Sequence, residues 1–255
     1  MRKYVTGANG FIGKHLVDTL DQKQGHDVML VKRPISVLNN HKEDQPFEFF
    51  HLSAYGNHYD QKDIDQLIQS NIADLSTVLK FVKNDNCVKF YNISTSSIQL
   101  PKQTIYSTSK LLGELMVESY GDSRFVNVRP YNVYGPGEAA HRFIPTVIRA
   151  LESGETIQLD EHATHDWILV DDFINAMFEG HTRIGTGKCF TNLDIVWMLE
   201  DISKRKLKYE PAKLRIYDTN NWVCAKGVDH IPIYEGLKLT YESFTQKNIR
   251  DKQEA

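Results

Sequence analysis

Two residues of this chain have the types and the spacing for proton transfer. Tyr106 and Lys110 stand four residues apart in the run Tyr-Ser-Thr-Ser-Lys, and this spacing places two side chains on one face of a helix. A lysine ammonium beside a phenol favours the phenolate and lowers the tyrosine pKa from its usual value of about 10. The pair predicts a proton donor that works near neutral pH, although the same spacing also occurs in helices without such a role.

A glycine-rich turn near the N-terminus indicates the kind of cofactor beside which this proton donor would act. Residues 2–6 have the pattern of a strand, the run Thr-Gly-Ala-Asn-Gly-Phe-Ile-Gly follows, and apolar residues then recur at helical spacing. Gly7 suits a tight turn, Gly10 a close approach to a pyrophosphate, and Gly13 the packing of helix on sheet. An ordinary strand-to-helix junction is the alternative. With the Tyr-Lys pair, the turn predicts a nicotinamide enzyme whose cofactor contacts include Gly7, Asn9, Gly10, Phe11, Ile12 and Gly13.

The residues after the second predicted strand, 27–31, bear on the choice of cofactor. In a dinucleotide-binding fold this strand ends beside the adenosine ribose, where an acidic residue binds the ribose hydroxyls of NAD. Lys32 and Arg33 stand there instead, and two cations favour the 2′-phosphate of NADP. We therefore predict NADP as the cofactor, with NAD as the alternative if both cations are simply solvated.

Hydroxyl side chains follow another predicted strand. The apolar-rich run Cys87 to Ile93 predicts a buried strand, and Ser-Thr-Ser-Ser comes directly after it. Ligands of open parallel sheets bind at the carboxyl ends of the strands. Thr95 is eleven residues from Tyr106, so its hydroxyl and the phenol are predicted to share one substrate oxygen, with Ser96 as the next candidate. Serines and threonines after a strand are also common turn formers.

These motifs, in this order, resemble the extended short-chain dehydrogenase/reductase family, which contains the NAD-dependent epimerases, dehydratases and reductases of nucleotide-activated sugars. His51-Leu-Ser-Ala, Ser-Asn-Ile-Ala, residues 129–137 and residues 166–172 add to the resemblance. It implies that Tyr106 is the general acid/base, that Lys110 binds the nicotinamide ribose, and that Thr95 contacts the reacting oxygen. It also implies cofactor contacts from Leu52, Ser53, Ala54, Asn71, Tyr106, Lys110, Tyr131 and Val133.

The predicted fold is α/β, with a doubly wound parallel (Rossmann) sheet and a small C-terminal substrate lobe. The dinucleotide domain is expected at residues 1–132 and about 166–190, and the substrate lobe at about 133–165 and 191–255. Fifteen residues separate Val31 from Phe47, too few for a further strand and its crossover. The third strand of the fold is therefore predicted to be absent or reduced to a loop, which would leave a more open adenine pocket and weaker cofactor binding.

Two departures from the family's pattern concern the substrate. Ser96 and Ser97 stand where the sugar-nucleotide dehydratases carry an Asp-Glu pair, so elimination of water is not expected. His165 stands where the family has an arginine that contacts the substrate diphosphate, and a neutral imidazole cannot match a guanidinium fork. Arg142 is the candidate to compensate, unless it is a solvated helix cation. Aromatic and apolar surface in the lobe is expected from Trp197, Met198, Trp222 and Tyr234, as core or as ligand contacts.

Composition excludes several other classes of protein. Hydrophobic residues make up 41% of the chain and charged residues 25%, as in soluble globular proteins. Without a long apolar run or a signal peptide, the chain is predicted to be cytoplasmic with no membrane partner. The net charge of −3 argues against nucleic acid, and the histidines lack the spacing of a metal site. Apolar residues on the predicted Tyr106 helix suit a homodimer or the core: Leu111, Leu112, Leu115 and Met116.

Three functions follow from these observations. The leading hypothesis is an NADP-dependent reductase of a keto group on a nucleotide-linked deoxysugar, with hydride from NADPH and the proton from Tyr106. The nearest alternative is an NAD-dependent nucleotide-sugar epimerase, which uses the same residues and returns hydride to the opposite face. A catalytically silent dinucleotide-binding sensor or scaffold is the alternative of another class, and the presence of Thr95, Tyr106 and Lys110 together argues against it.

Overall fold

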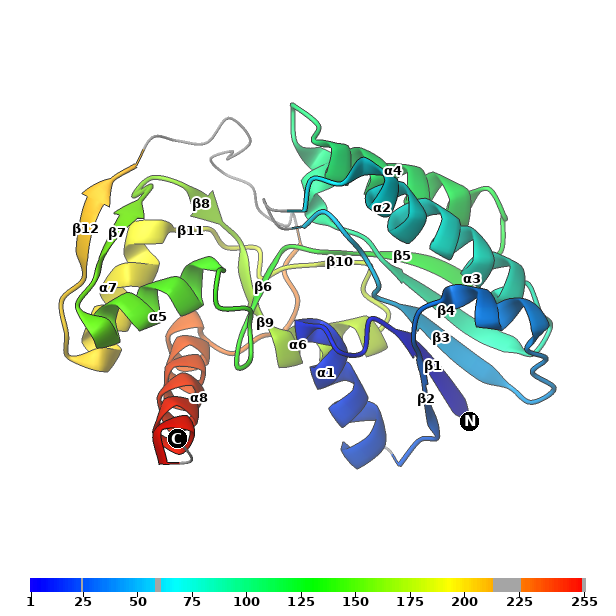
Figure 1. Ribbon diagram of the computed structural model, residues 1–255, viewed down its shortest axis with the longest axis horizontal. Coiled ribbons are helices and arrows are strands. Elements are labelled where there is room, and N and C mark those ends of the chain that lie inside the picture. Colours follow the sequence, from blue (N-terminus) through cyan, green and yellow to red (C-terminus); the bar gives the residue numbers. More distant parts are fainter. Residues whose placement is uncertain (24, 58–60, 213–225, 254–255) are drawn as a thin grey trace. The chain divides into compact units, whose positions relative to one another are not determined.

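The computed structural model describes residues 1–23, 25–57, 61–212 and 226–253. The chain divides into two compact units, Met1–Pro130 and Tyr131–Ala255 (Figure 1). Trp222, one of the aromatic residues assigned to the substrate lobe, lies outside the described residues.

The first unit is built on a parallel sheet with helices on both sides. Its five strands pair in the order β2, β1, β3, β4, β5. Helices α2, α3 and α4 lie along one side and α1 along the other (Figure 1), which confirms the doubly wound prediction. The elements are β1 Arg2–Thr6, α1 Phe11–Asp18, η1 Thr19–Lys23, β2 Val28–Val31, η2 Ile35–Asn40, β3 Phe47–His51, α2 Ile64–Ile68, η3 Gln69–Ala73, α3 Asp74–Val82, β4 Cys87–Ile93, η4 Ser96–Gln99, α4 Ile105–Glu118 and β5 Phe125–Pro130.

Aromatic side chains fill the core between this sheet and helix α3. Tyr4, Phe49 and Phe90 come from three adjacent strands and are fully or almost fully buried. Leu75 and Leu79 of α3 belong to the same cluster, one turn apart on the apolar face of the helix. Because packed cores resist deformation, this cluster fixes the strand ends that carry the candidate site.

The segment between β2 and β3 confirms the predicted loss of the third strand. Residues 32–46 contain only the short helix η2, and β3 pairs directly with β1. Strand β2 is therefore left at the end of the strand order.

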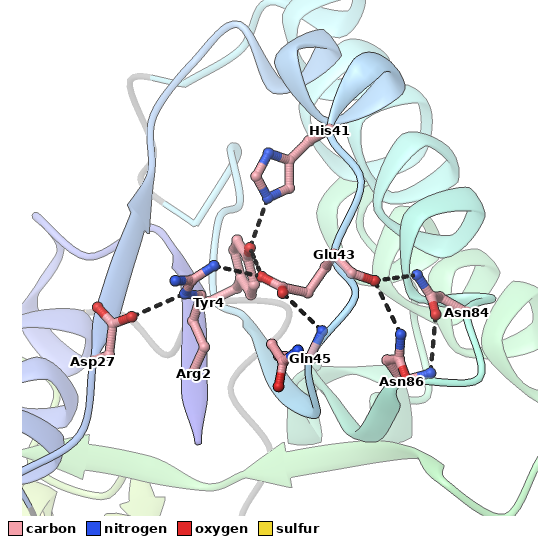
Figure 2. Close-up of polar contacts among 8 residues, drawn as sticks. All are labelled: Arg2, Tyr4, Asp27, His41, Glu43, Gln45, Asn84 and Asn86. Carbon is pink, nitrogen blue, oxygen red and sulfur yellow. Dashed lines mark hydrogen bonds and ion pairs between the residues drawn. The ribbon is translucent and has the colours of Figure 1, made fainter.

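A buried carboxylate anchors this shortened connection to the sheet (Figure 2). Glu43 accepts hydrogen bonds from Tyr4 Oη at 2.6 Å and from Arg2 Nη1 at 2.7 Å, and its backbone oxygen accepts from the Asn84 and Asn86 side chains at 3.1 Å. Burial raises the pKa of Glu43, but the hydrogen bonds from Tyr4, the Gln45 N–H and Arg2 outweigh it and lower the pKa to about 2. The network ties the connection to β1 and to the turn before β4.

The second unit packs α5, α7 and α8 with short strand pairs. Strands β6 and β9 are parallel, β7 and β12 are parallel, and β8 and β11 are antiparallel. Apolar residues of α5, α7 and α8, among them Ile148, Leu199 and Leu237, form the core of this unit. The elements are β6 Asn132–Tyr134, α5 Phe143–Ser153, β7 Thr156–Leu159, β8 Thr164–His165, β9 Trp167–Leu169, α6 Val170–Phe178, β10 Arg183–Ile184, β11 Phe190–Thr191, α7 Asn192–Ser203, β12 Lys208–Pro211 and α8 Ile233–Gln253.

Three of the residues expected to supply lobe surface are described in this unit. Met198 packs against the core, whereas Trp197 is 58% exposed. Tyr234 is at the surface and donates a hydrogen bond to Asp201 at 2.6 Å. Within the described ranges, no helix combines the length and the apolar character needed to cross a membrane.

Candidate active site

The glycine turn has the close backbone contacts that its sequence predicts. Gly7 has a φ of +69°, and a Cβ there would lie 2.8 Å from the Ser53 nitrogen. A Cβ on Gly13 would collide with the Gly7 carbonyl oxygen, so helix α1 can approach the turn only without a side chain there. The Gly10 N–H donates to Gly7 O at 2.9 Å, and α1 begins at Phe11. The first amides of a helix lack intrahelical acceptors and favour anions, so this turn can hold the pyrophosphate of a dinucleotide.

The chain after β3 runs beside this turn, as the predicted contacts of Leu52, Ser53 and Ala54 require. The Ser53 N–H donates to Thr6 Oγ1 at 3.3 Å, and Thr6 Oγ1 lies 2.9 Å from His51 Nδ1. Burial lowers the pKa of His51 to about 3, assisted by the nearby charges of Lys110 and Arg33. His51 is therefore a neutral structural link between β1 and β3.

Helix α4 carries the Tyr-Lys pair and begins with a capping box. The Thr104 hydroxyl accepts from the Ser107 N–H, and the Ser107 hydroxyl accepts from the Thr104 N–H, which fixes the first turn. Tyr106 in that turn is half-buried, and Lys110 one turn later is buried. Burial lowers the pKa of Lys110 to about 8, against the opposing effect of Glu114.

Asn71 positions this helix through three hydrogen bonds. Its side chain accepts from the Tyr55 N–H and donates to the Tyr55 carbonyl, both at 2.8 Å, and donates to Ser109 Oγ at 2.9 Å. Ser109 in turn donates to the Tyr106 carbonyl at 2.7 Å. Asn71 lies in the π-helical turn η3, an irregularity that is frequent at functional sites.

A glycine that the sequence analysis missed lies against the Tyr106 ring. Gly56 has a φ of +97°, and a Cβ there would be 3.4 Å from Tyr106 Cδ2 and 2.8 Å from Leu67 Cδ1. The position thus favours glycine because of its positive φ and because the Leu67 side chain leaves little room for a Cβ. The isolated glycine in Ala-Tyr-Gly-Asn is a turn signal, but nothing in it indicates the tyrosine fifty residues later.

The hydroxyl run lies at the carboxyl end of β4. Thr95 is half-buried, accepts from the Ser97 N–H and donates to Ser97 Oγ, both at 3.1 Å. Ser96 is buried at the start of η4, which packs on α4. Thr95, Ser96, Tyr106 and Lys110 thus come from two adjoining elements, η4 with its cap and α4.

The two cations after β2 differ in their surroundings. Register pairs Thr6 with Val31, so Lys32 and Arg33 follow β2 beside the glycine turn. Lys32 is exposed. Arg33 donates to Asp74 Oδ2 at 3.1 Å and also to the Ser70 hydroxyl, so much of its charge is already compensated.

In the second unit, Arg142 is close enough to His165 to influence its pKa. Arg142 Nε is 3.4 Å from Glu138 Oε1, and burial raises the pKa of Glu138 to about 7. Burial, together with the Arg142 charge, lowers the pKa of His165 to about 4, so its imidazole is neutral at pH 7. Predicted cofactor residues Tyr131 and Val133 are buried in the same unit, and their contact with a cofactor stays a prediction.

A pocket with an empty volume of about 470 Å³, including space open to solvent, lies in the second unit. Its lining combines the aromatic residues Tyr134, Trp167 and Phe190 with the basic residues Lys188 and His230. The buried Trp167 Nε1 has no hydrogen-bond partner among the described residues. The pocket suits a ligand with a flat or apolar part and an anionic, hydrogen-bond-accepting part. The described part of the chain contains no group of three or more His, Cys, Asp or Glu residues able to hold a metal ion.

Comparison with known proteins identifies the family. A sequence profile of the NAD dependent epimerase/dehydratase family matches residues 3–190, and the chain belongs to this family. It is 25% identical to CDP-abequose synthase of Salmonella muenchen, over 83% of this chain and 84% of that protein. It is 27% identical to GDP-6-deoxy-D-talose 4-dehydrogenase of Aggregatibacter actinomycetemcomitans, over 84% of each chain.

Solved structures of similar proteins support the fold. UDP-N-acetylglucosamine 4-epimerase from Methanobrevibacter ruminantium superposes with a TM-score of 0.84 at 20% identity, over 96% of this chain and 98% of that chain. UDP-glucose 4-epimerase of Thermus thermophilus in complex with NAD superposes with a TM-score of 0.75 at 21% identity, over 96% and 99%. The predicted fold and membership in a family of NAD(P)-dependent, nucleotide-sugar-modifying enzymes are confirmed.

Proposed function

We propose that the protein is an NADPH-dependent reductase of a keto group on a nucleotide-linked sugar. The observation that carries the choice of reductase is the end of β2, where Lys32 and Arg33 stand beside the glycine turn and an acidic residue for the NAD ribose is missing. Similarity to a 4-dehydrogenase and to dTDP-4-dehydro-6-deoxy-D-allose reductase of Streptomyces sp, 25% identical, agrees with redox chemistry on such sugars.

The residues of the first unit have separate roles in this proposal. Bound NADPH supplies a hydride to the carbonyl carbon of the substrate. Tyr106 gives its phenolic proton to the carbonyl oxygen, which completes the alcohol, and the charged Lys110 stabilises the phenolate left behind. The Thr95 hydroxyl donates a hydrogen bond to the same oxygen as negative charge develops there, and Ser96 lies beside it.

Substrate binding is proposed for the second unit. Neutral His165 cannot pair with a diphosphate by charge, and Arg142 already faces Glu138. The pocket lined by Trp167, Lys188 and His230 offers an ammonium group, an imidazole and an aromatic surface to a nucleotide diphosphate. It is our candidate for the nucleotide end of the substrate, with Arg142 as a further contact.

The test uses cofactor-stripped protein, nucleotide-linked keto sugars, and NADPH or NADH. We expect net consumption of NADPH, abolished in Tyr106→Phe with little change in cofactor affinity and retained in Tyr120→Phe, an exposed tyrosine just after α4. Redox-neutral turnover with bound NAD would instead establish the epimerase, which the NAD-bound epimerase structures favour. Dinucleotide binding without turnover would favour the alternative of a catalytically silent sensor or scaffold.

Cofactor choice is tested by fluorescence titration of Lys32→Ala. Because Asp74 compensates Arg33, we expect Lys32→Ala to weaken the binding of NADPH about two- to fivefold, as for an exposed ion pair, and to leave the binding of NADH unchanged. Lys80→Ala, an exposed lysine on α3, is the control. Tighter binding of NADH than of NADPH by the unmodified protein would overturn the NADP assignment, and an adenine ring fully buried in a tight complex would contradict the open pocket.

A homodimer is also proposed, with helices α2 and α4 at its interface. These helices contact each other and expose large apolar side chains: Ile64 at 52%, Ile68 at 50%, Ile105 at 56%, Leu112 at 46% and Leu115 at 54%. Such a patch is typical of an interaction surface. Sedimentation should show a dimer that Leu115→Glu dissociates, and a monomeric unmodified protein would refute it. The cytoplasm remains the predicted compartment.

A further inference from the structure

Helix α4 carries a row of ionisable side chains at four-residue intervals. Tyr106, Lys110 and Glu114 share one face of the helix, with neighbouring Cβ atoms about 5–6 Å apart. Lys110 is 6% exposed and Glu114 is 1% exposed. Opposite charges that are shielded from water interact more strongly than in bulk water.

Glu114 is paired with a cation from the sheet. Arg129 on β5 donates through Nε to both carboxylate oxygens, at 2.8 and 3.0 Å, and through Nη2 to Oε2. A buried carboxylate with such a bidentate guanidinium partner stays charged. Glu114, held in place by Arg129, thus puts a carboxylate one turn from Lys110.

Two other titratable side chains of the described ranges, His51 and Arg33, do not supply this charge. His51 on β3 interacts with Lys110 electrostatically, but it is neutral because burial lowers its pKa to about 3. Arg33, after β2, is a cation and is paired with Asp74 of α3. Burial disfavours the charged form of Lys110, and Glu114 opposes that effect.

We propose that Glu114, held by Arg129, keeps Lys110 charged beside Tyr106. Glu114 touches no reacting atom, so it is a positioning residue that acts through Lys110. The consequence for catalysis rests on the proposed function, in which the Lys110 charge stabilises the Tyr106 phenolate. Without the carboxylate, Lys110 loses its proton at a lower pH. The basic limb of the plot of kcat/KM against pH then moves to lower pH as well.

The expected size is an order-of-magnitude estimate for charges on adjacent helical turns. At an assumed separation of about 6 Å and an effective dielectric constant of about 20, two unit charges shift each other's titration by about two units. Arg129 lies against Glu114 and offsets part of this field, so we expect Glu114→Gln to lower the titration midpoint of Lys110 by about one pH unit.

The titration can be followed without any substrate, by NMR of protein labelled at the lysine ε-carbons. The Lys110 signal is the one missing from Lys110→Met. We expect its midpoint to fall by about one unit in Glu114→Gln and to stay unchanged in Glu118→Gln, an exposed glutamate one turn further along α4. An unchanged midpoint in Glu114→Gln would overturn the proposal.

Two further measurements keep the test decisive. If Glu114→Gln does not fold, the double variant Glu114→Gln/Arg129→Gln removes both charges of the pair. The titration midpoint of Lys110 should still fall in it, by less than one pH unit. An unchanged or raised midpoint would overturn the proposal. With substrate, the basic limb of kcat/KM should move to lower pH in Glu114→Gln, which a purely structural role would not cause. Absence of turnover in the unmodified protein as well as in the variants would refute the proposed function and leave the NMR result interpretable.

Discussion

Substitution of Lys110 by methionine is expected to make the cofactor-free protein more stable while it removes a residue of the candidate active site. Lys110 is 6% exposed, and burial lowers its pKa to about 8 even though Glu114 favours the charged form. An ammonium group that leaves water without full compensation destabilises the folded state. Methionine keeps an unbranched side chain that adapts to its surroundings and carries no charge to hydrate.

The size of this effect follows from the pKa of Lys110, which falls from 10.5 to about 8. One pKa unit corresponds to about 1.4 kcal/mol, so burial of the charged form destabilises the folded protein by about 3 kcal/mol at pH 7. Because the folded pKa lies below the unfolded one, the folded state releases its proton first as pH rises. The destabilisation is complete below about pH 8, diminishes between 8 and 10.5, and is absent above that range.

Urea unfolding of the cofactor-stripped protein at several pH values measures this prediction. Lys110→Met should be about 3 kcal/mol more stable than the unmodified protein at pH 7, and the difference should diminish toward pH 10.5. Lys80→Met, an exposed lysine on α3, should change stability by no more than about 0.5 kcal/mol at every pH. A less stable Lys110→Met at pH 7, or a gain that does not depend on pH, would refute the reasoning.

Two further substitutions test the anchor of the shortened connection and the space beside Tyr106. Glu43→Gln should lower the unfolding free energy by about 2 to 3 kcal/mol at pH 7. Since the folded pKa of Glu43 is about 2, its contribution is complete above pH 4.5 and is lost as pH falls toward 2. An equal difference at pH 3 and pH 7 in denaturant unfolding would contradict this. Gly56→Ala should reduce kcat about tenfold, because the positive φ and the clash with Leu67 Cδ1 shift the segment that lies against Tyr106. Gly121→Ala, with a φ of +62° and open space, should only destabilise the protein; equal kcat values for the two variants would exclude a role for the Gly56 segment in positioning Tyr106.

Much of the first unit could be predicted because its signals are local. The turn at Gly7 needs a positive φ, and the close contact at Gly13 leaves no room for a side chain. Both positions therefore require glycine, which is visible in the sequence. The absent third strand followed from chain length alone, since fifteen residues cannot hold a strand and its crossover. The helical face shared by Tyr106 and Lys110 followed from their spacing.

The contacts that the sequence analysis missed join residues far apart in the chain. Glu43 meets Arg2 and Tyr4 about forty residues away, and no local pattern marks a glutamate as the partner of a strand across the sheet. Arg33 was predicted from its position to serve a phosphate, whereas its pairing with Asp74 depends on how α3 packs on η2, the short helix after β2. Such pairings are set by tertiary structure, which spacing and residue type do not encode.

Stability and function are separated along the strands of the first unit. Arg2 begins β1 and Glu43 precedes β3, so the anchor lies at the amino ends of these strands, whereas the glycine turn follows their carboxyl ends. Strands of five residues span about 15 Å, and sites at that distance without shared partners contribute additively. The unfavourable burial of Lys110 and the favourable network around Glu43 should therefore be independent. In Glu43→Gln/Lys110→Met the two changes should add to within about 0.5 kcal/mol, and a larger coupling would mean that the shortened connection also shapes the site.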